Sequence, residues 1–195
     1  NAKATSKQSD EGMLLRDNIY GSIEEDAERR DFTINALYYS AIDFKVYDFA
    51  NGVQDVFDKK IRLIGDPETR YREDPVRMLR AIRFSTKLDM AISQETEAPI
   101  HELASLLDNI PAARMFEEFL KMFISGKATA NFLLLRDYKL FQYFFPALEQ
   151  LLTQDSHPHL DAFITLAMNN TDNRINNNQR VTPAFLIAAF LWYPM

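Results

Sequence analysis

The 195-residue sequence contains no cysteine, so disulfide bonds, cysteine-based zinc sites and cysteine nucleophiles are excluded. A chain without disulfides fits a reducing cytoplasm, where we expect the protein to act. The sequence also lacks an apolar run of about 18 residues, the length that a membrane-spanning helix needs. Its longest run, Ala184–Tyr193, is shorter and predicts a buried helix. The opening segment Asn1–Gly12 is polar, so no signal peptide is recognised.

Positive charge is scarce overall. The chain has 22 Lys and Arg against 28 Asp and Glu, which gives a formal net charge of −6. This balance argues against a complete nucleic-acid-binding protein, because phosphate contacts require Lys and Arg. The arginines are unevenly distributed, however, so an acidic protein of this kind can still carry a basic groove. Those that cluster are Arg62, Arg70, Arg72, Arg77, Arg80 and Arg83.

Histidines are few and scattered. They are His101, His157 and His159, and no pattern of carboxylates around them completes a metal site.

Hydrophobic periodicity divides the chain into a mixed N-terminal part and a helical remainder. The spacing predicts a helix over Asp26–Ile42, strands over Phe44–Phe49 and Lys60–Ile64, and a short helix over Val53–Asp58. From Pro67 onward only helices are predicted. They cover Pro75–Lys87, Thr96–Asn109 with a cap near Ser93, Pro111–Ser125, Ala128–Tyr138, Pro158–Asn170 and Pro183–Tyr193, with a polar loop over Asp172–Arg180. The predicted fold class is therefore α+β and predominantly α-helical.

A first candidate site lies in the charged segment Glu24–Asn35. Taken alone, such a segment is more often a helix start whose acidic first turn complements the helix dipole. In the functional interpretation, Arg30, Asp31 and Asn35 lie on neighbouring helical turns and face a phosphate or ribose. Asp31 and Asn35 are four residues apart and would share one face of the predicted helix.

A second candidate site lies on the helix predicted over Pro75–Lys87. Three arginines, namely Arg77, Arg80 and Arg83, fall within an arc of about 120° on the side opposite its apolar stripe. Asp74 precedes Arg77 by one turn, and an Asp–Arg pair offers acceptors and donors that suit the edge of a nucleotide base. A structural network of acidic and basic side chains fits the same pattern equally well.

Aromatic stripes elsewhere are interpreted as core. One comprises Phe116, Phe119, Leu120 and Phe123 at helical spacing, and another is the run Tyr138–Phe145.

Three motifs occur together in one order. Arg29–Leu37 (RRDFTINAL), Asp48–Val56 (DFANGVQDV) and Glu73–Ala81 (EDPVRMLRA) resemble successive motifs of the class II nucleotidyltransferase superfamily, which comprises CCA-adding enzymes and bacterial poly(A) polymerases. The second motif departs from the family pattern D-x-x-G-G-x-x-D-L at Asn51 and Val56. The resemblance covers about residues 16–125.

Further segments resemble the bacterial poly(A) polymerase branch. They are Tyr20–Asp26, Ile64–Tyr71, Ile110–Glu117, Arg180–Phe185 and Trp192–Pro194. A CCA-adding tRNA nucleotidyltransferase is the alternative within the superfamily. A helical module that binds RNA or protein without catalysis is the alternative outside it.

The resemblance implies a domain organisation. After a disordered boundary segment over residues 1–12, residues 13–66 would form the C-terminal remnant of a nucleotidyltransferase head. Residues 67–125 would form a helical neck that contacts nucleotide and RNA, and residues 126–195 the start of a helical body.

The resemblance also implies a reaction, the addition of AMP from ATP to RNA 3′ ends in RNA processing and decay. The RNA 3′-hydroxyl would attack the α-phosphate and release pyrophosphate. The nucleotide-binding residues would be Asp74 and Arg77 at the base, and Arg30, Asp31 and Asn35 at the ribose and phosphate. Arg80 and Arg83 would hold the triphosphate or support the residues at the base.

Two magnesium ions would activate the nucleophile and stabilise the leaving group. The family places their carboxylates in a D-x-D strand pair after a glycine-rich motif, and the sequence contains neither pattern. The metal carboxylates are therefore expected before Asn1. We expect no catalytic residue and no metal ligand in the chain, which would be inactive alone.

Overall fold

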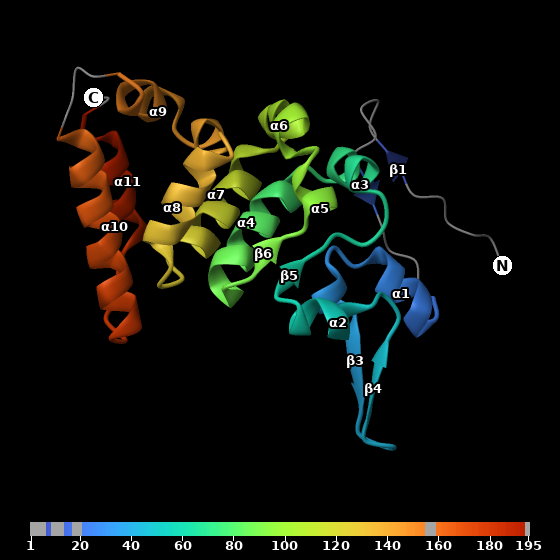
Figure 1. The fold of residues 1–195 in the computed structure, drawn as a ribbon. Coiled ribbons are helices and arrows are strands. Elements are labelled where there is room, and N and C mark those ends of the chain that lie inside the picture. Colours follow the sequence, from blue (N-terminus) through green and yellow to red (C-terminus); the bar gives the residue numbers. More distant parts are fainter. Residues whose placement is uncertain (1–6, 9–13, 17–20, 155–158, 194–195) are drawn as a thin grey trace. The chain divides into compact units, whose positions relative to one another are not determined.

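The computed structural model describes residues 7–8, 14–16, 21–154 and 159–193. Most of segment 1–12, which was expected to be disordered, lies outside these residues. The chain divides into two compact units, residues 1–106 and 107–195. The described part is mainly helical with short strands, so the predicted α+β, predominantly helical class is confirmed (Figure 1).

In its described residues, the first unit combines three two-stranded sheets with short helices. The sheets are β1 (Lys7–Gln8) antiparallel to β2 (Leu14–Arg16), β3 (Leu37–Ser40) antiparallel to β4 (Lys45–Asp48), and β5 (Lys60–Ile61) parallel to β6 (Ala91–Ile92). The helices are α1 (Ile23–Arg29), a 3-10 turn at Thr33–Asn35, α2 (Gly52–Phe57), α3 (Pro67–Glu73), α4 (Val76–Leu88), α5 (Gln94–Glu97) and α6 (Ile100–Leu103).

The helix predicted over Asp26–Ile42 is wrong after its first turn. Helix α1 ends at Arg29, and the chain then runs beside residues 62–64, where the Thr33 amide donates to the Arg62 carbonyl (3.0 Å) and the Ile64 amide to the Asp31 carbonyl (2.9 Å). The next residues enter β3, whose aromatic side chains pair across the hairpin with β4. These non-local pairings override a periodicity that was compatible with a helix.

Two further expectations need correction. Strand β6 lies within a region that was predicted to be only helical, because its backbone pairs with β5. The helix predicted over Thr96–Asn109 is broken into α5, α6 and a 3-10 turn at Ala104–Asn109, with Pro99 at the start of α6. The predicted cap at Ser93 is confirmed, since its side chain accepts from the Thr96 amide.

The core of the first unit is built around α4. This helix buries an apolar face that includes Met78, Leu79 and Ile82, all with no exposed area. Tyr71 on α3 is equally buried, and its hydroxyl donates to the Thr96 carbonyl (2.8 Å). Burial of this apolar face fixes the direction in which the arginine side of α4 points within the unit.

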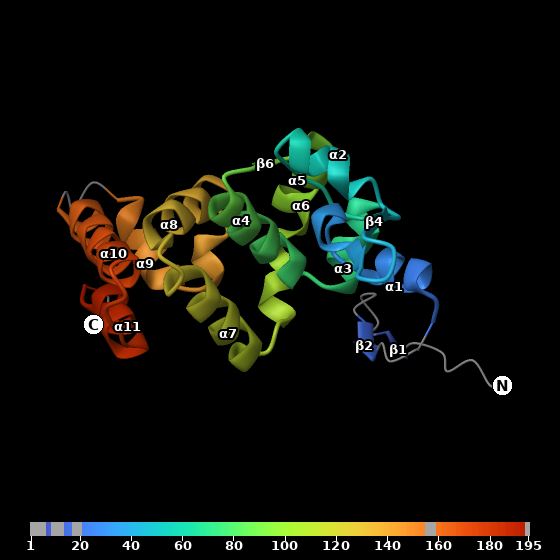
Figure 2. The ribbon, with the colours of Figure 1, turned by 90° about the horizontal axis from the view of Figure 1, so that it is seen from below.

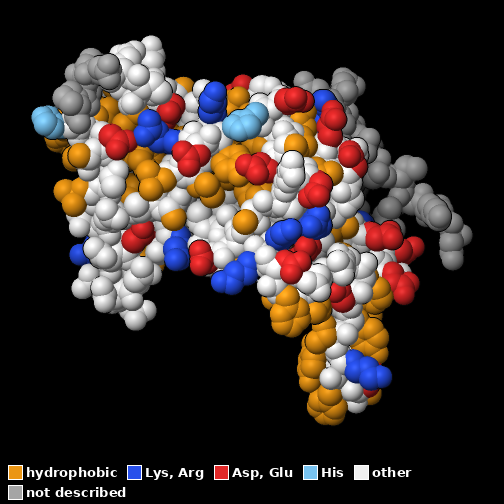
Figure 3. All heavy atoms as spheres, in the orientation of Figure 1, with side chains coloured by type: hydrophobic (Ala, Val, Ile, Leu, Met, Phe, Trp, Pro, Cys, Tyr) orange, Lys and Arg blue, Asp and Glu red, His pale blue; other side chains and the backbone are white. Residues whose placement is uncertain are grey.

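The β3–β4 hairpin exposes much of its apolar surface. Side chains of this kind gather over it in the space-filling view, and the most exposed are Tyr39, Ile42, Phe44 and Val46 (Figure 3).

The second unit is helical. Its elements are α7 (Ala112–Phe123), α8 (Ala128–Asp137), a 3-10 turn at Phe141–Tyr143, α9 (Pro146–Leu152), α10 (Leu160–Asn176) and α11 (Pro183–Leu191). Helices α10 and α11 lie side by side in both ribbon views (Figure 2). The loop predicted over Asp172–Arg180 is wrong in its first part, because α10 continues to Asn176. Asp172 acts within this helix by accepting the backbone amides of Ala128 and Thr129 at the start of α8.

The second unit has an aromatic core. Phe190 is in ring contact with Phe119, Phe123 and Phe141, and all four are buried, so the core interpretation is confirmed for these side chains. Phe116 differs, since 44% of its area is exposed.

Candidate functional site

Arg77 is fixed by acceptors on the preceding helix. Its side chain is largely buried, and Nη1 donates both to Glu73 Oε2 (2.9 Å) and to the Arg70 carbonyl (2.7 Å). The ion pair of Arg77 is therefore with Glu73, whereas the sequence suggested Asp74. Asp74 lies between α3 and α4, where its Oδ1 accepts the Val76 amide (3.2 Å) and helps to begin α4.

Arg70 joins this cluster to the segment after α1. Its Nη1 donates to Glu73 Oε2 (2.9 Å), so two guanidinium groups share one carboxylate oxygen. Its Nη2 donates to the carbonyls of Arg29 (3.1 Å) and Arg30 (2.6 Å), about forty residues earlier in the chain. Burial, and then the positive charge of Arg77, lower the pKa of Arg70.

Asp31 forms a second link between the same two segments. Its Oδ1 accepts the Asn35 side-chain amide (2.9 Å) and the Phe32 backbone amide (2.9 Å), while its Oδ2 pairs with Arg80 of α4. The structure thus brings Asp31 and Asn35 together as predicted, but through a turn and a 3-10 helix instead of one helix face.

Arg30 lies at the exposed end of this arrangement. Its guanidinium pairs with Asp26 of α1 (2.8 Å), and the Tyr38 hydroxyl donates to the same carboxylate oxygen (2.7 Å). The hydrogen bond from Tyr38, together with that from Arg30, lowers the pKa of the Asp26 carboxyl. Hydrogen bonds therefore order the side chain of Arg30 as well as its carbonyl.

Arg83 lies one turn beyond Arg80 on α4. Its guanidinium carbon is 4.6 Å from the centre of the Phe84 ring, and that of Arg80 is 5.3 Å from the same ring. Both cations lie within the range of attraction to an aromatic face. Phe84 thus lies beside both arginine side chains.

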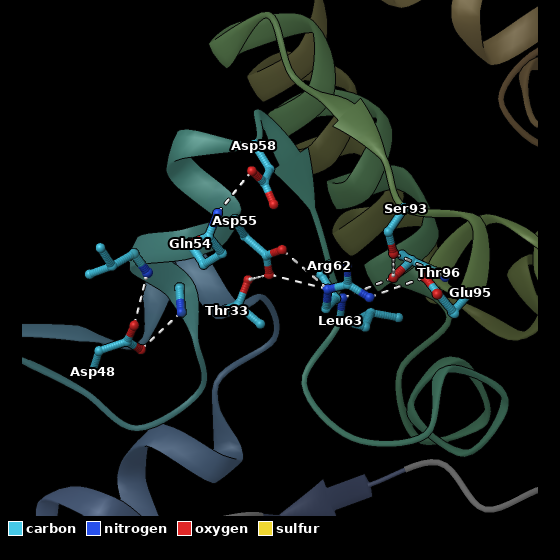
Figure 4. Close-up of polar contacts among 12 residues, drawn as sticks. Thr33, Asp48, Gln54, Asp55, Asp58, Arg62, Leu63, Ser93, Glu95 and Thr96 are labelled. Atoms are coloured by element: carbon cyan, nitrogen blue, oxygen red, sulfur yellow. Dashed lines mark hydrogen bonds and ion pairs between the residues drawn. The ribbon is translucent and has the colours of Figure 1, made fainter.

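The second motif forms a turn that begins α2 (Figure 4). Asp48 accepts the backbone amides of Ala50 (3.2 Å), Gly52 (2.9 Å) and Val53 (2.9 Å). Burial raises the pKa of the Asp48 carboxyl, but hydrogen bonds from these amides lower it by more, so the net shift is downward. The carboxylate is therefore the form that the turn stabilises.

Two residues of this turn meet special backbone requirements. Asn51 has a φ of 62°, a left-handed conformation that Asn adopts more readily than most residues, so the departure from glycine in the family pattern is tolerated. At Gly52 a Cβ atom would lie 2.2 Å from the Thr33 carbonyl oxygen, so the close approach of the first and second motifs requires glycine.

Asp55, near the end of the second motif, connects that motif to other elements. The side chain is buried, and it accepts the Thr33 hydroxyl (2.7 Å) and Arg62 Nε (3.2 Å), while Arg62 Nη1 reaches Glu95 of α5 (3.1 Å) (Figure 4).

The sequence did not single out Arg70 or Glu73 as partners of Arg77, nor Thr33 or Arg62 as partners of Asp55. Arg70, Glu73 and Arg77 are separated by three and four residues, the spacing of neighbouring side chains on a helix. This spacing was the signal in the sequence that could have indicated their contact. The contacts between Arg62 and Asp55 had no such signal.

Metal ligation finds no support among the described residues, which contain no group of three or more His, Cys, Asp or Glu placed to hold an ion. They do not fit the two magnesium ions that the resemblance implies. Within residues 7–8, 14–16, 21–154 and 159–193, no helix has both the length and the apolar character to cross a bilayer.

Two family models match the chain. One is described as the poly A polymerase head domain and matches residues 1–62. The other is described as a probable RNA- and SrmB-binding site of polymerase A and matches residues 89–152. Poly(A) polymerase I of Salmonella typhi is 56% identical over 193 residues, which is 99% of this chain and 42% of that protein.

The chain belongs to the poly(A) polymerase family of nucleotidyltransferases. The resemblance inferred from the three motifs is thus confirmed. This member of the family spans less than half the length of the Salmonella relative.

CCA-adding enzymes are more distant relatives. That of Bacillus subtilis is 39% identical over 140 residues, covering 70% of this chain and 35% of the enzyme. The crystal structure of the Bacillus stearothermophilus CCA-adding enzyme in complex with CTP is similar, with a TM-score of 0.58 and 37% identity. That match covers 63% of this chain and 31% of the enzyme.

Proposed function

We propose that the protein containing this chain is a template-independent RNA nucleotidyltransferase that adds AMP from ATP to RNA 3′ ends. The observation that carries the proposal is the Asp31 carboxylate, which joins Asn35 of the first motif to Arg80 of the third. This bridge brings three of the nucleotide-binding candidates, from two motifs, into one cluster of the first unit. The identity to poly(A) polymerase I along nearly the whole chain supports ATP as the nucleotide.

The cluster suggests how the roles are divided. Asp74 and Arg77 face the base, and the contacts of Arg77 with Glu73 and the Arg70 carbonyl fix the plane of its guanidinium. A planar fork of fixed orientation suits the edge of a base. Arg80 and Arg83 hold the triphosphate or support the residues at the base. Arg30, Asp31 and Asn35 line the ribose and phosphate.

In the reaction, the RNA 3′-hydroxyl attacks the α-phosphate of ATP, and pyrophosphate leaves. Divalent metal ions serve this family, and we propose two magnesium ions, which supply nucleophile activation and leaving-group stabilisation when bound. The side chains of this chain bind and orient the nucleotide. RNA 3′ ends and ATP meet in the bacterial cytoplasm, where we place the activity.

We further propose that residues 13–66 belong to the head of this enzyme, residues 67–125 to its neck and residues 126–195 to its body. The head assignment is supported by the family model over residues 1–62.

Primer extension tests the function. The full-length protein is incubated with magnesium, labelled oligo(A) and one nucleoside triphosphate at a time. We expect long tails with ATP and little incorporation of CTP. Addition of C and then A to a tRNA that lacks its end, without growth of oligo(A) tails, would instead indicate a CCA-adding enzyme. RNA binding without any nucleotide binding would indicate a non-catalytic module.

A further inference from the structure

We propose that Arg70 is a positioning residue for nucleotide selection, because it connects the backbone of the first motif to the carboxylate that holds Arg77. The inference rests on the proposed function and assigns Arg70 a part in it.

Arg70 and Arg77 share one carboxylate oxygen of Glu73. Glu73 Oε2 accepts Nη1 of both Arg70 and Arg77 at 2.9 Å, and the three side chains retain only 18%, 12% and 10% of their exposed area, respectively. Glu73 therefore cannot turn away from Arg70 without also moving the donor of Arg77. In this partly buried setting, charge-assisted hydrogen bonds are strong enough to fix orientation.

Arg70 also contacts the backbone of the first motif. Nη2 donates to the carbonyls of Arg29 and Arg30, and the next residue is Asp31, whose carboxylate binds Asn35 and Arg80. Arg70 thus contacts the peptide directly before Asp31 and the Glu73 carboxylate that binds Arg77. A displacement at either end is transmitted to the other through one rigid guanidinium group.

The arrangement leaves one buried donor of Arg70 without an acceptor in the described part of the chain. Arg70 Nε is buried and has no hydrogen-bond partner among the described residues. A buried donor without a partner lowers stability and calls for an explanation. The hydrogen bonds of Nη1 to Glu73 and of Nη2 to the two carbonyls hold the guanidinium in the orientation in which Nε has no partner within the residues that the structure describes.

Replacing Arg70 with Lys tests the inference. Lysine keeps the charge, but it lacks the planar guanidinium group that donates to Glu73 and to the two backbone carbonyls. In the full-length protein, we expect Arg70→Lys to lower the ratio of kcat/KM for ATP over that for CTP by about tenfold, within the range that a base-reading pair contributes. Oligo(A) affinity should stay close to wild type, whereas the melting temperature should fall, because hydrogen bonds to Glu73 and to the two carbonyls are lost. Asp31→Asn should lower the same ratio if the two links act together.

Arg72→Lys is the matched control. Arg72 lies on the same helix, is exposed and pairs only with Glu68 among its described contacts (2.8 Å), so the ATP-to-CTP ratio should not change.

The possible outcomes are distinct. An unchanged ratio in Arg70→Lys, with a wild type that prefers ATP, overturns the inference and leaves the proposed function intact. Loss of ATP selectivity, oligo(A) affinity and melting temperature in equal proportion would make Arg70 merely structural and also overturns it. A wild type without preference for ATP contradicts the proposed function, and the inference with it.

Discussion

Among single residues, Arg77 is the one whose removal most directly tests the proposed contact with the nucleotide base. Arg77→Ala deletes the guanidinium that Glu73 orients, so we expect the preference of the full-length enzyme for ATP over CTP to fall by about 1–3 kcal/mol. Oligo(A) affinity should change little, because the proposed contact is with the nucleotide. Steady-state kinetics with each nucleotide, and a separate RNA titration, give the two quantities.

Arg72→Ala serves as the control, since it removes an exposed arginine that pairs with Glu68 on the same helix. If the Arg77 variant keeps the ATP preference of the wild type, the base-facing role is wrong.

Asp55 is a residue-scale test of stability. Asp55→Asn keeps the shape of a buried side chain but replaces the carboxylate, which accepts hydrogen bonds from Thr33 and Arg62, with a neutral amide. The free energy of unfolding should therefore fall by about 1–3 kcal/mol. Urea denaturation measures this change. The exposed Asp58, bonded to Gln54 on the same helix, gives the control Asp58→Asn, which should change stability by less than about 0.5 kcal/mol. Equal losses in the two variants would mean that the buried network contributes nothing specific.

At the scale of elements, the turn that starts α2 should depend on pH through Asp48. Its carboxyl has a folded pKa below the unfolded value of about 3.9, so its stabilising contribution is complete above about pH 5. The contribution is lost as the pH falls through the folded pKa. Wild type should therefore be more stable than Asp48→Asn at pH 7, and the difference should shrink toward zero below about pH 4.

Unfolding curves of both proteins at several pH values measure this difference. Asp58→Asn, at the other end of α2, should give a small difference throughout. A gap between wild type and Asp48→Asn that stays constant down to pH 3 would show that the Asp48 carboxylate does not act through its charge.

Elements were predictable where the signal is local. The capped start at Ser93, the hairpin strand β4 and the amphipathic α4 follow from spacing and side-chain type. Strand β3 was missed because its partner decides its conformation, and β6 because only pairing with β5 makes it a strand. Helix α10 continues past Asp172, whose carboxylate accepts two amides at the start of α8, a contact that no local pattern contains.

The candidate site was predictable as a set of residues but not as a network. The three motifs identified the segments, and the structure brings Asp31, Asn35 and Arg80 together. The partner of Arg77 was mistaken because Asp74 and Glu73 both lie close to it in sequence. The orientation of α3 decides in favour of Glu73, and sequence spacing does not contain that orientation.

At the scale of the whole molecule, charge bears on RNA binding. The chain has a formal net charge of −6, and the region matched by the RNA- and SrmB-binding model, residues 89–152, has five Lys and Arg against nine Asp and Glu. The arginines of α4 supply local positive charge, but the proposed function assigns them to the nucleotide. The chain spans 42% of the length of its Salmonella relative. We therefore expect most of the RNA affinity of the full-length protein to come from outside these residues.

Phosphate binding weakens with salt by a slope of roughly −0.7 for each phosphate neutralised on a single strand, so the slope counts the contacts. The 195-residue chain should bind labelled oligo(A) with a dissociation constant near 10⁻⁴ M or weaker, roughly the non-specific range, and with a shallow slope. The full-length protein should bind more tightly and with a steeper slope. Titrations of both at two salt concentrations make the comparison. Equal affinities and equal slopes would locate the RNA-binding site within this chain, because no additional phosphate contacts would then be made by the rest of the protein.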